Sequence, residues 1–448
     1  MRRISRYSII SLTLALAGLI ALTSCSDDTT RPRPKETGPI ADGPISDGPV
    51  TTKTLRFVRK EVLDPQKAGR YAWIAKTAGK LGVAYFRVES KEKDQPCPPS
   101  GTAQKRPVSE IYYVAYDGTN WGTPSLVAEV VGPTFGLSLT FDGSNNPNVG
   151  HLGGALSLTE CSSSDAVRSV STDGGKTFTE QMINSGVAPG DTAGHWTNLA
   201  RDPSGAIQSV YRDVQFGHYT KDGDARADLR YGPSGEGIAE GDGDGVYAAL
   251  LFKQDGTPVV SATNFIDETV SNRGLKVFWK EGDTWETKKV YNGAVGERPG
   301  FGTNDQGLFA LAYYTTRDES LQYVESPDLK TWTAPKLVDF STTDHGTFAS
   351  IAFDSHGNPG ISYYRCGKSG SSAQGCDPVQ DALMFAYRQN GHWKTYEVDT
   401  GGANFCGRYT SLVFDEGDHP VIAYQCVTLD NKTNTFPDTL KVAHGVWK

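Results

Sequence analysis

One short pattern recurs seven times along this 448-residue chain, and it constrains the fold more than any other feature. It is clearest in residues 350–364, SIAFDSHGNPGISYY, where apolar residues alternate on both sides of a Gly/Pro turn. Alternation with a period of two around a tight turn is typical of a β-hairpin with one buried face. The turn positions of the seven copies are Lys76, Asp142, Asp202, Lys253, Asn304, Asp354 and Asp415. A tyrosine follows nine residues later in five copies, as Tyr85, Tyr211, Tyr313, Tyr363 and Tyr424.

A second hairpin follows the first in each copy. In four copies its marker is a tryptophan just past a polar turn, at Trp121, Trp285, Trp332 and Trp393. Two hairpins per copy give four antiparallel strands, and sheets of this kind in a radial array form a propeller. A row of β-sandwiches is the alternative, which we disfavour because no linker-like break separates the copies. We therefore predict that residues 54–448 form an all-β domain, a seven-bladed β-propeller of four-stranded antiparallel blades.

The two ends of this region complement each other. The last copy stops at Lys448 after three strands, and residues 54–63, TLRFVRKEVL, supply a strand that belongs to no copy. Joined end to end, they parallel residues 391–400 of the preceding copy. We expect the first strand to complete the last blade, because closing the ring in this way removes exposed sheet edges.

The N-terminal residues have the composition of an export signal. Residues 1–24 combine three early arginines with an apolar segment at 9–22, and they lead into Leu-Thr-Ser-Cys. This ending resembles a bacterial lipobox, and the resemblance implies that Cys25 is lipidated. The alternative is an ordinary signal peptide followed by a chance cysteine. Ser26 follows where an aspartate would resemble an inner-membrane retention signal, so we expect a lipoprotein of the cell envelope, with the outer membrane favoured.

Residues 25–53 should form a flexible tether. This segment repeats Gly-Pro with aspartates and has no apolar period. The full chain carries a net charge of −8 and no block of Lys or Arg, which disfavours nucleic acid as a partner. We expect the exported protein to be a monomer.

Six cysteines remain after Cys25, and an even number in an exported chain predicts disulfides. One pair is equidistant from the turn of the last copy's first hairpin, a second brackets a short Gly/Ser-rich loop, and two cysteines remain in long loops of the first and second copies. The alternative is that some are free thiols. The predicted pairs are Cys406–Cys426, Cys366–Cys376 and Cys97–Cys161.

Metal-binding motifs are weak in this sequence. Asp222-Gly-Asp224 and Asp242-Gly-Asp244 could bind calcium, but neither continues as an EF-hand loop. We expect solvated turns at both places and no cofactor or metal, with calcium as the alternative.

Residues 171–178, STDGGKTF, match the Asp-box, or BNR repeat, at Ser171, Asp173, Gly175 and Phe178. Residues 326–332 look like a shortened copy. On these motifs the chain resembles the sialidase-like Asp-box β-propeller superfamily. The resemblance implies that each box lies between the third and fourth strands of a blade as a structural turn. For a sialidase it would imply three arginines on a carboxylate, a Tyr nucleophile with a Glu base, and an Asp acid.

The candidate binding residues come from segments that enter the innermost strands or leave the second strands. These positions share one face of a propeller, and the long insertions 87–110, 152–168, 212–226, 262–274 and 365–382 lie there too. Tyr and Trp can stack on sugar faces, while Arg and Asp can bind hydroxyl or carboxylate groups. Core packing and inter-blade ion pairing are the alternative roles. The candidates are Arg70, Tyr71, His195, Trp196, Tyr211, Arg212, Asp213, Arg298, Tyr364, Arg365, Arg408 and Tyr409.

Three functions stay open at this point. We favour a surface-tethered propeller that binds a glycan or another extracellular or cell-surface partner without catalysis. An Arg-Ile-Pro motif, usual near the start of sialidase domains, is absent, and seven copies exceed the usual six. The second hypothesis is a sialidase-type exo-glycosidase that uses Arg70, Arg298 and Arg408, with Asp191, Asp213, Glu297 and Asp344 as acid candidates. The third is a scaffold for other envelope proteins.

Overall fold

The computed structural model of the protein describes most of the predicted propeller. The described residues are 54–96, 103–131, 135–153, 164–185, 192–219, 225–239, 243–264, 274–339, 344–367, 381–400, 405–427 and 437–448. Within these ranges there is no helix with the length and hydropathy needed to cross a membrane. Several predictions concern residues outside these ranges and therefore stay predictions: the signal peptide, Cys25, the tether, Cys97, Cys161, Cys376, Asp191, and the turn acids Asp222, Asp224 and Asp242.

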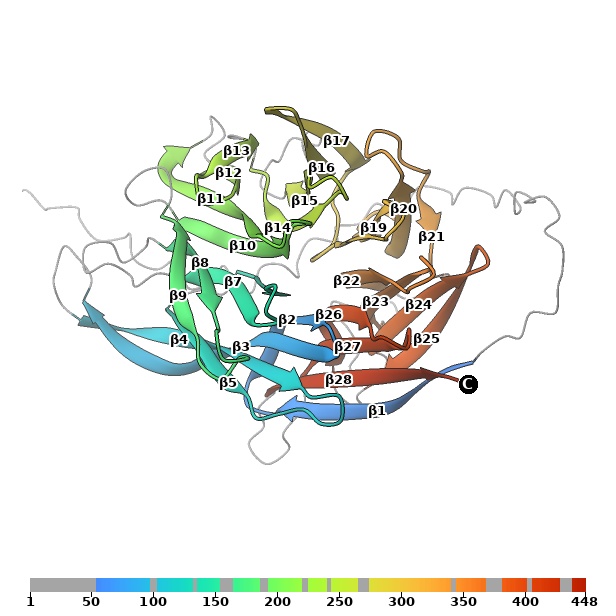
Figure 1. Cartoon of the computed structure of the whole chain (residues 1–448), viewed down its shortest axis with the longest axis horizontal. Helices are drawn as coiled ribbons and strands as arrows, with labels where there is room; N and C mark the ends of the chain where they lie inside the picture. Colours follow the sequence, from blue (N-terminus) through green and yellow to red (C-terminus); the bar gives the residue numbers. More distant parts are fainter. Residues whose placement is uncertain are drawn as a thin grey trace, which may run out of the picture.

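The described residues form seven four-stranded antiparallel sheets around a central axis (Figure 1). The innermost strands of neighbouring blades contact one another all the way round. They are β2 (Ala68–Thr77), β6 (Leu137–Phe141), β10 (Thr192–Arg201), β14 (Val246–Phe252), β18 (Gly300–Thr303), β22 (Asp344–Phe353) and β26 (Phe405–Phe414). The second strands are β3 (Lys80–Pro96), β7 (Pro147–Gly153), β11 (Ile207–Tyr219), β15 (Pro258–Asn264), β19 (Phe309–Thr315), β23 (Pro359–Cys366) and β27 (Pro420–Val427).

The third and fourth strands complete each blade towards the outside. The third strands are β4 (Ala103–Tyr116), β8 (Asp165–Val170), β12 (Ala225–Tyr231), β16 (Gly274–Glu281), β20 (Ser320–Ser326), β24 (Ala382–Gln389) and β28 (Asp438–Trp447). The outermost strands are β5 (Ser125–Val131), β9 (Thr179–Asn184), β13 (Glu236–Ala239), β17 (Thr284–Asn292), β21 (Lys336–Leu337), β25 (His392–Asp399) and β1 (Leu55–Asp64). The predicted seven-bladed propeller is confirmed.

Ring closure is also confirmed. Strand β1 pairs antiparallel with β28, from Leu55 opposite Trp447 to Asp64 opposite Leu440. In Figure 1 the blue β1 runs beside the red β28, the last strand of the chain. Thr54 and Lys448 exchange two backbone hydrogen bonds of 2.8 and 2.9 Å at the end of the pair. The first and last described segments therefore share one sheet.

The insertion at 87–110 is more regular than its sequence suggested. Strands β3 and β4 continue into it and stay paired as far as Pro96 and Ala103. In its described part it is a long two-stranded β-ribbon.

The repeated tyrosines anchor neighbouring blades to each other. All five are fully buried on second strands. In three of them the hydroxyl donates to an aspartate at or just beyond the end of the preceding blade's outermost strand. The bonds are Tyr85 to Asp64 at 2.8 Å, Tyr363 to Asp339 at 2.6 Å, and Tyr424 to Asp399 at 2.6 Å. The sequence revealed the tyrosines but not these partners.

A second inter-blade contact repeats along the axis. A side-chain oxygen on one innermost strand accepts a hydrogen bond from a backbone N–H of the next innermost strand. This bond joins Leu199 to Ser138 at 2.8 Å, and Leu250 to Asn198, Leu412 to Ser350 and Ile74 to Ser411 at 3.0 Å each. Where Gly300 takes the equivalent position, a Cβ would lie 3.0 Å from the Ile351 nitrogen, so the two strands approach through their backbones.

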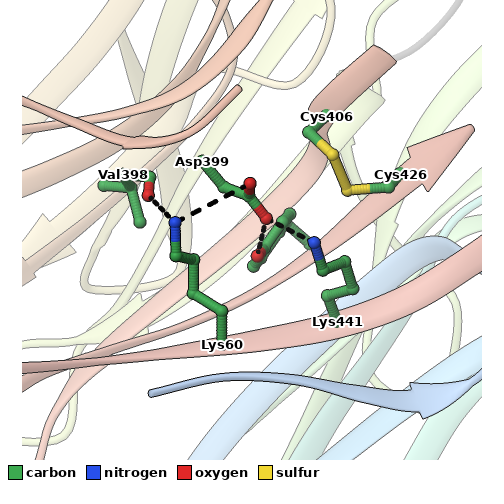
Figure 2. The surroundings of a disulfide bond; sticks show 7 residues. Lys60, Val398, Asp399, Cys406, Cys426 and Lys441 are labelled. Atoms are coloured by element: carbon green, nitrogen blue, oxygen red, sulfur yellow. Dashed lines mark hydrogen bonds and ion pairs between the residues drawn. A yellow bond between two sulfur atoms is a disulfide. The ribbon is translucent and has the colours of Figure 1, made fainter. Parts of the chain in front are cut away.

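The last blade carries the predicted disulfide between Cys406 and Cys426, which are paired residues of β26 and β27. Figure 2 shows Asp399 close to this bond, with the amino groups of Lys441 and Lys60 on its carboxylate at 2.5 and 3.9 Å. Cys366 is also disulfide-bonded, and its partner lies outside the described residues.

The Asp-box segment forms a tight turn between β8 and β9. The carboxylate of Asp173 accepts hydrogen bonds of 3.0 Å from the backbone of Lys176 and Thr177, and the Ser171 hydroxyl accepts one of 2.8 Å from Gly175. Phe178 packs against Tyr113, with ring centroids 5.7 Å apart. These contacts give the segment a structural role.

One turn prediction is wrong. Asp244, expected in a solvated turn, is fully buried and forms an ion pair of 2.6 Å with Lys276. Its preceding glycines suggested a surface loop, but the charge of Lys276 allows the carboxylate to be buried.

Replacing Asp64 with Ala should lower the free energy of unfolding by about 3 kcal/mol, because Tyr85 and Arg87 both lose their buried acceptor. Tyr85→Phe removes one hydroxyl and should cost about 1 kcal/mol. Urea denaturation measures both values. Equal losses in the two variants would show that Asp64 is not a shared acceptor.

Candidate functional site

The innermost strands begin with the same unusual backbone conformation. At the start of each, one residue has a φ between 50° and 70°, namely Tyr71, Gly136, Trp196, Tyr247, Arg298, Phe348 and Tyr409. Six of these are not glycine, and their φ values lie between 50° and 55°. Left-handed backbone costs such a residue about 1–2 kcal/mol, so each is held in place by its surroundings.

A glycine two residues earlier explains how six of these strands can start in this way. A Cβ on Gly194 would lie 2.4 Å from the Asp165 carbonyl oxygen, and one on Gly407 would lie 2.7 Å from the Cα of Leu383. Both contacts are with the third strand of the preceding blade. The glycine lets the chain pass close to that strand and turn sharply. The side chain two positions later is thereby directed to the channel, which is the space that the seven innermost strands surround.

We call the six side chains Tyr71, Trp196, Tyr247, Arg298, Phe348 and Tyr409 the mouth cluster. They come from different blades but contact one another. The ring centroids of Tyr71 and Tyr409 are 4.7 Å apart, those of Phe348 and Tyr409 4.6 Å, and those of Trp196 and Tyr247 5.4 Å. Aromatic surface from five blades therefore gathers at one end of the channel.

Arg298 reaches across this cluster from the fifth blade to the first. Its Nη2 donates a 2.9 Å hydrogen bond to the Ala72 carbonyl oxygen, and its guanidinium lies 5.1 Å from the Trp73 ring centroid. Burial lowers the pKa of Arg298 to about 10, so it stays charged at neutral pH. Its buried Nη1 has no hydrogen-bond partner in the described part of the chain.

A cavity of about 140 Å³ lies at the level of the mouth cluster. Residues of all seven innermost strands line it, including Tyr71, Trp196, Tyr247 and Arg298. Ligand pockets commonly measure about 300–1,000 Å³, so this cavity has room for an end group and not for a whole oligosaccharide.

Other charged groups surround the cluster. Arg70 Nε donates to the Tyr409 hydroxyl at 3.3 Å. Burial raises the pKa of Glu297, and the charges of Arg408 and Arg70 oppose that rise. Burial raises the pKa of Asp438 to about 6, again opposed by Arg70 and Arg408. Tyr71 and Tyr409 also have raised pKa values because they are buried, so both phenols are protonated at neutral pH.

Several hydrogen-bond donors of the site are buried. Several buried N–H groups near the channel have no partner among the described residues, which is costly unless a ligand or water supplies an acceptor. They are Trp196 Nε1, Arg212 Nε and Nη2, Arg298 Nη1 and Arg408 Nε.

The structure brings most of the predicted residues together. Arg70, Tyr71, Trp196, Arg298 and Tyr409 meet at the channel. His195 stacks on Phe135 beside Trp196 at 4.1 Å, and the guanidinium groups of Arg212 and Arg408 lie 5.8 and 5.6 Å from the rings of Trp196 and Tyr364.

The remaining candidates lie elsewhere. Tyr211 packs between blades against Ala166 and Ala193. Arg365 forms an ion pair of 2.6 Å with Glu397. Tyr364 is different, because its ring packs against Phe348 of the mouth cluster, with centroids 6.2 Å apart, while its hydroxyl donates to Asp381 at 2.7 Å. Asp213 is buried opposite Asp228 in the β11–β12 register, and Asp344 begins β22.

Tyr247, Phe348 and Asp438 belong to the site but were not among the sequence candidates. The signal that could have found the first two is a glycine followed two residues later by an aromatic residue at the start of an innermost strand, as in Gly245–Tyr247 and Gly346–Phe348. Asp438 has no such signal, because its neighbours Arg70 and Arg408 are distant in sequence.

Comparisons with known proteins found no matching family model and no matching curated protein. Among solved structures, the chain is similar to a protein of unknown function from Dyadobacter fermentans, at 12% identity and a TM-score of 0.49 over 88% of this chain and 99% of that one. It is similar to the Penicillium chrysogenum alpha-L-arabinanase complexed with arabinobiose, at 13% identity and a TM-score of 0.44 over 87% and 98%. It is also similar to the Hadza microbial sialidase Hz136, at 11% identity and a TM-score of 0.42 over 88% and 96%.

The raised pKa of Asp438 predicts a pH-dependent stability. An acid whose pKa is higher in the folded state stabilises the fold most below its unfolded value, and this stabilisation is lost as the pH rises through about 6. Between pH 4 and 7 the wild type should lose roughly 2 kcal/mol of unfolding free energy relative to Asp438→Asn. Urea denaturation across this range measures the difference, and parallel pH profiles would contradict it.

Proposed function

We propose that this protein binds an acidic glycan at the mouth cluster and does not cleave it. The single observation that carries the proposal is the position of Arg298, a charged guanidinium with an unpaired buried Nη1, in a cavity bordered by aromatic rings. A guanidinium pairs strongly with carboxylate or sulfate, and aromatic faces stack on sugar rings. An acidic sugar combines both properties.

The size and depth of the cavity favour recognition of a chain end. An acidic terminal sugar can place its anionic group against Arg298 while its ring rests on Tyr71, Trp196 or Tyr409. The rest of the glycan then extends from the cavity over the same end of the propeller. A protein partner that carries such a glycan would bind in the same way.

The placement of the protein belongs to the same proposal. A lipid on Cys25 would anchor it in the cell envelope, with the outer membrane favoured, and residues 25–53 would hold the propeller away from the membrane. On such a tether the mouth cluster can meet glycans outside the membrane.

Sialidase-type hydrolysis is the second candidate, and one observation favours it. The Tyr71 and Tyr409 side chains lie near Glu297, which is the pairing that a tyrosine nucleophile with a carboxylate base would need. The high pKa values of both phenols argue for binding, because neither tyrosine is activated in the free protein.

Purified residues 26–448 should bind carboxylated or sulfated glycans on an array and leave their neutral counterparts unbound. Arg298→Gln should weaken that binding about tenfold or more, because it removes the binding free energy of a charge-assisted hydrogen bond. Arg365→Gln is the matched control, because Arg365 is paired with Glu397 away from the channel. Equal binding by the wild type and Arg298→Gln would overturn the site.

Incubation with fluorogenic sialosides and other acidic glycosides should release no fluorophore above the rate without protein. Turnover that disappears in both Tyr71→Phe and Glu297→Gln would establish the second candidate instead. Retained folding of each variant is checked by circular dichroism.

A further inference from the structure

Arg212 is an unusual buried charge. It lies on β11 and is 4% exposed, and its buried Nε and Nη2 have no hydrogen-bond partner within the described part of the chain. The neighbouring buried cations have hydrogen-bonded acceptors: Arg230 pairs with Asp228 at 2.5 Å and Lys276 with Asp244 at 2.6 Å. The charge of Asp244 also attracts Arg212, but Nε and Nη2 of Arg212 form no hydrogen bond with it. Burying guanidinium N–H groups without a hydrogen-bond acceptor strongly disfavours the folded state. The stability of the fold therefore does not explain why an arginine occupies position 212.

The position of Arg212 is fixed by its surroundings. Its guanidinium lies 5.8 Å from the Trp196 ring centroid. Its stem passes Gly245, where a Cβ would lie 3.0 Å from the Cβ of Arg212. Glycine at 245 therefore makes room for the arginine between the third and fourth blades. A charged donor held this rigidly loses little entropy when it meets an anion.

Two more nitrogen atoms without partners lie beside it. Trp196 Nε1 is buried and unpaired, and so is Nδ1 of His195, which is 7% exposed and stacks on Phe135. Burial and the charge of Arg212 lower the pKa of His195 to about 3, so the imidazole is neutral and can donate or accept. Together the three residues present several buried nitrogen atoms without a hydrogen-bond partner.

This group is next to the mouth cluster but separate from Arg298. Trp196 and Arg298 line the same cavity, whereas Arg212 lies against the Trp196 ring on the third blade. The electrostatic partners of Arg298 are Tyr71, Tyr409 and Tyr247, while that of Arg212 is Asp244. The two guanidinium groups therefore lie in different blades, and Trp196 connects the Arg212 position to the cavity.

We infer that Arg212, Trp196 and His195 form a second anion-binding site. It binds a carboxylate or sulfate group of a second sugar in the glycan that Arg298 holds. This inference rests on the proposed function and makes it more specific. The ligand is an oligosaccharide with at least two acidic sugars, and a singly acidic glycan fills only the Arg298 position.

The test uses an array of matched oligosaccharides with no, one or two acidic groups, with carboxylated and sulfated members as separate arms. Purified residues 26–448 should bind the doubly acidic members about tenfold more tightly than the singly acidic ones. Arg212→Gln should remove this preference and leave singly acidic binding within about twofold of the wild type. The arm with the larger preference identifies the anion.

A second variant keeps the test decisive if Arg212→Gln does not fold. Trp196→Phe retains an aromatic ring but lacks the indole N–H, and it should lower the ratio of doubly to singly acidic binding several-fold. Equal binding of singly and doubly acidic glycans by the wild type would overturn the second site alone. Failure of every acidic glycan to bind, or no effect of Arg298→Gln, would overturn the proposed function as well.

Discussion

Seven strands must pass close to one axis, and the rest of the structure depends on how they do so. Each begins with a left-handed residue, and in six blades a glycine two positions earlier allows the close approach to the preceding blade. Further along, hydroxyl and amide oxygens bond to the next strand's backbone, as Ser411 does with Ile74. The same turn that lets the strands converge also points six side chains into the channel mouth. Packing and site are thus products of one backbone geometry.

The polar groups of this propeller fall into two kinds. The hydroxyls of Tyr85, Tyr363 and Tyr424 are buried with aspartate acceptors and hold neighbouring blades together. Arg298 and Arg212 are buried without comparable acceptors. Since buried donors are normally satisfied, the first kind stabilises the fold, and the second kind is where we propose that a ligand binds.

The sequence predicted the fold well because its signals are local and repeated. Alternation around each turn gave the hairpins, and the unmatched strand at 54–63 gave the ring closure. The disulfide between Cys406 and Cys426 followed from their equal distance to a turn. Asp244 was misjudged because its buried partner Lys276 lies in another strand.

The site was predicted only in part, for a related reason. Sequence position alone predicted Arg70, Trp196 and Arg298 as site residues, because they lie at the starts of innermost strands. Whether such an arginine binds a ligand or a neighbouring acid depends on residues distant in sequence. Arg365 was a candidate of the same kind, yet Glu397 pairs with it. Asp438 lies near Arg70 and Arg408 only because the first and last blades are neighbours in the folded ring.

The most direct test of the account is a crystal structure of residues 26–448 with the acidic oligosaccharide that binds most tightly. The account predicts an anionic group of the ligand within hydrogen-bonding distance of Arg298 Nη1, with a sugar ring against the aromatic side chains of the mouth cluster. Ligand bound on the outer strands or at the opposite end of the channel, with Arg298 unchanged, would contradict it.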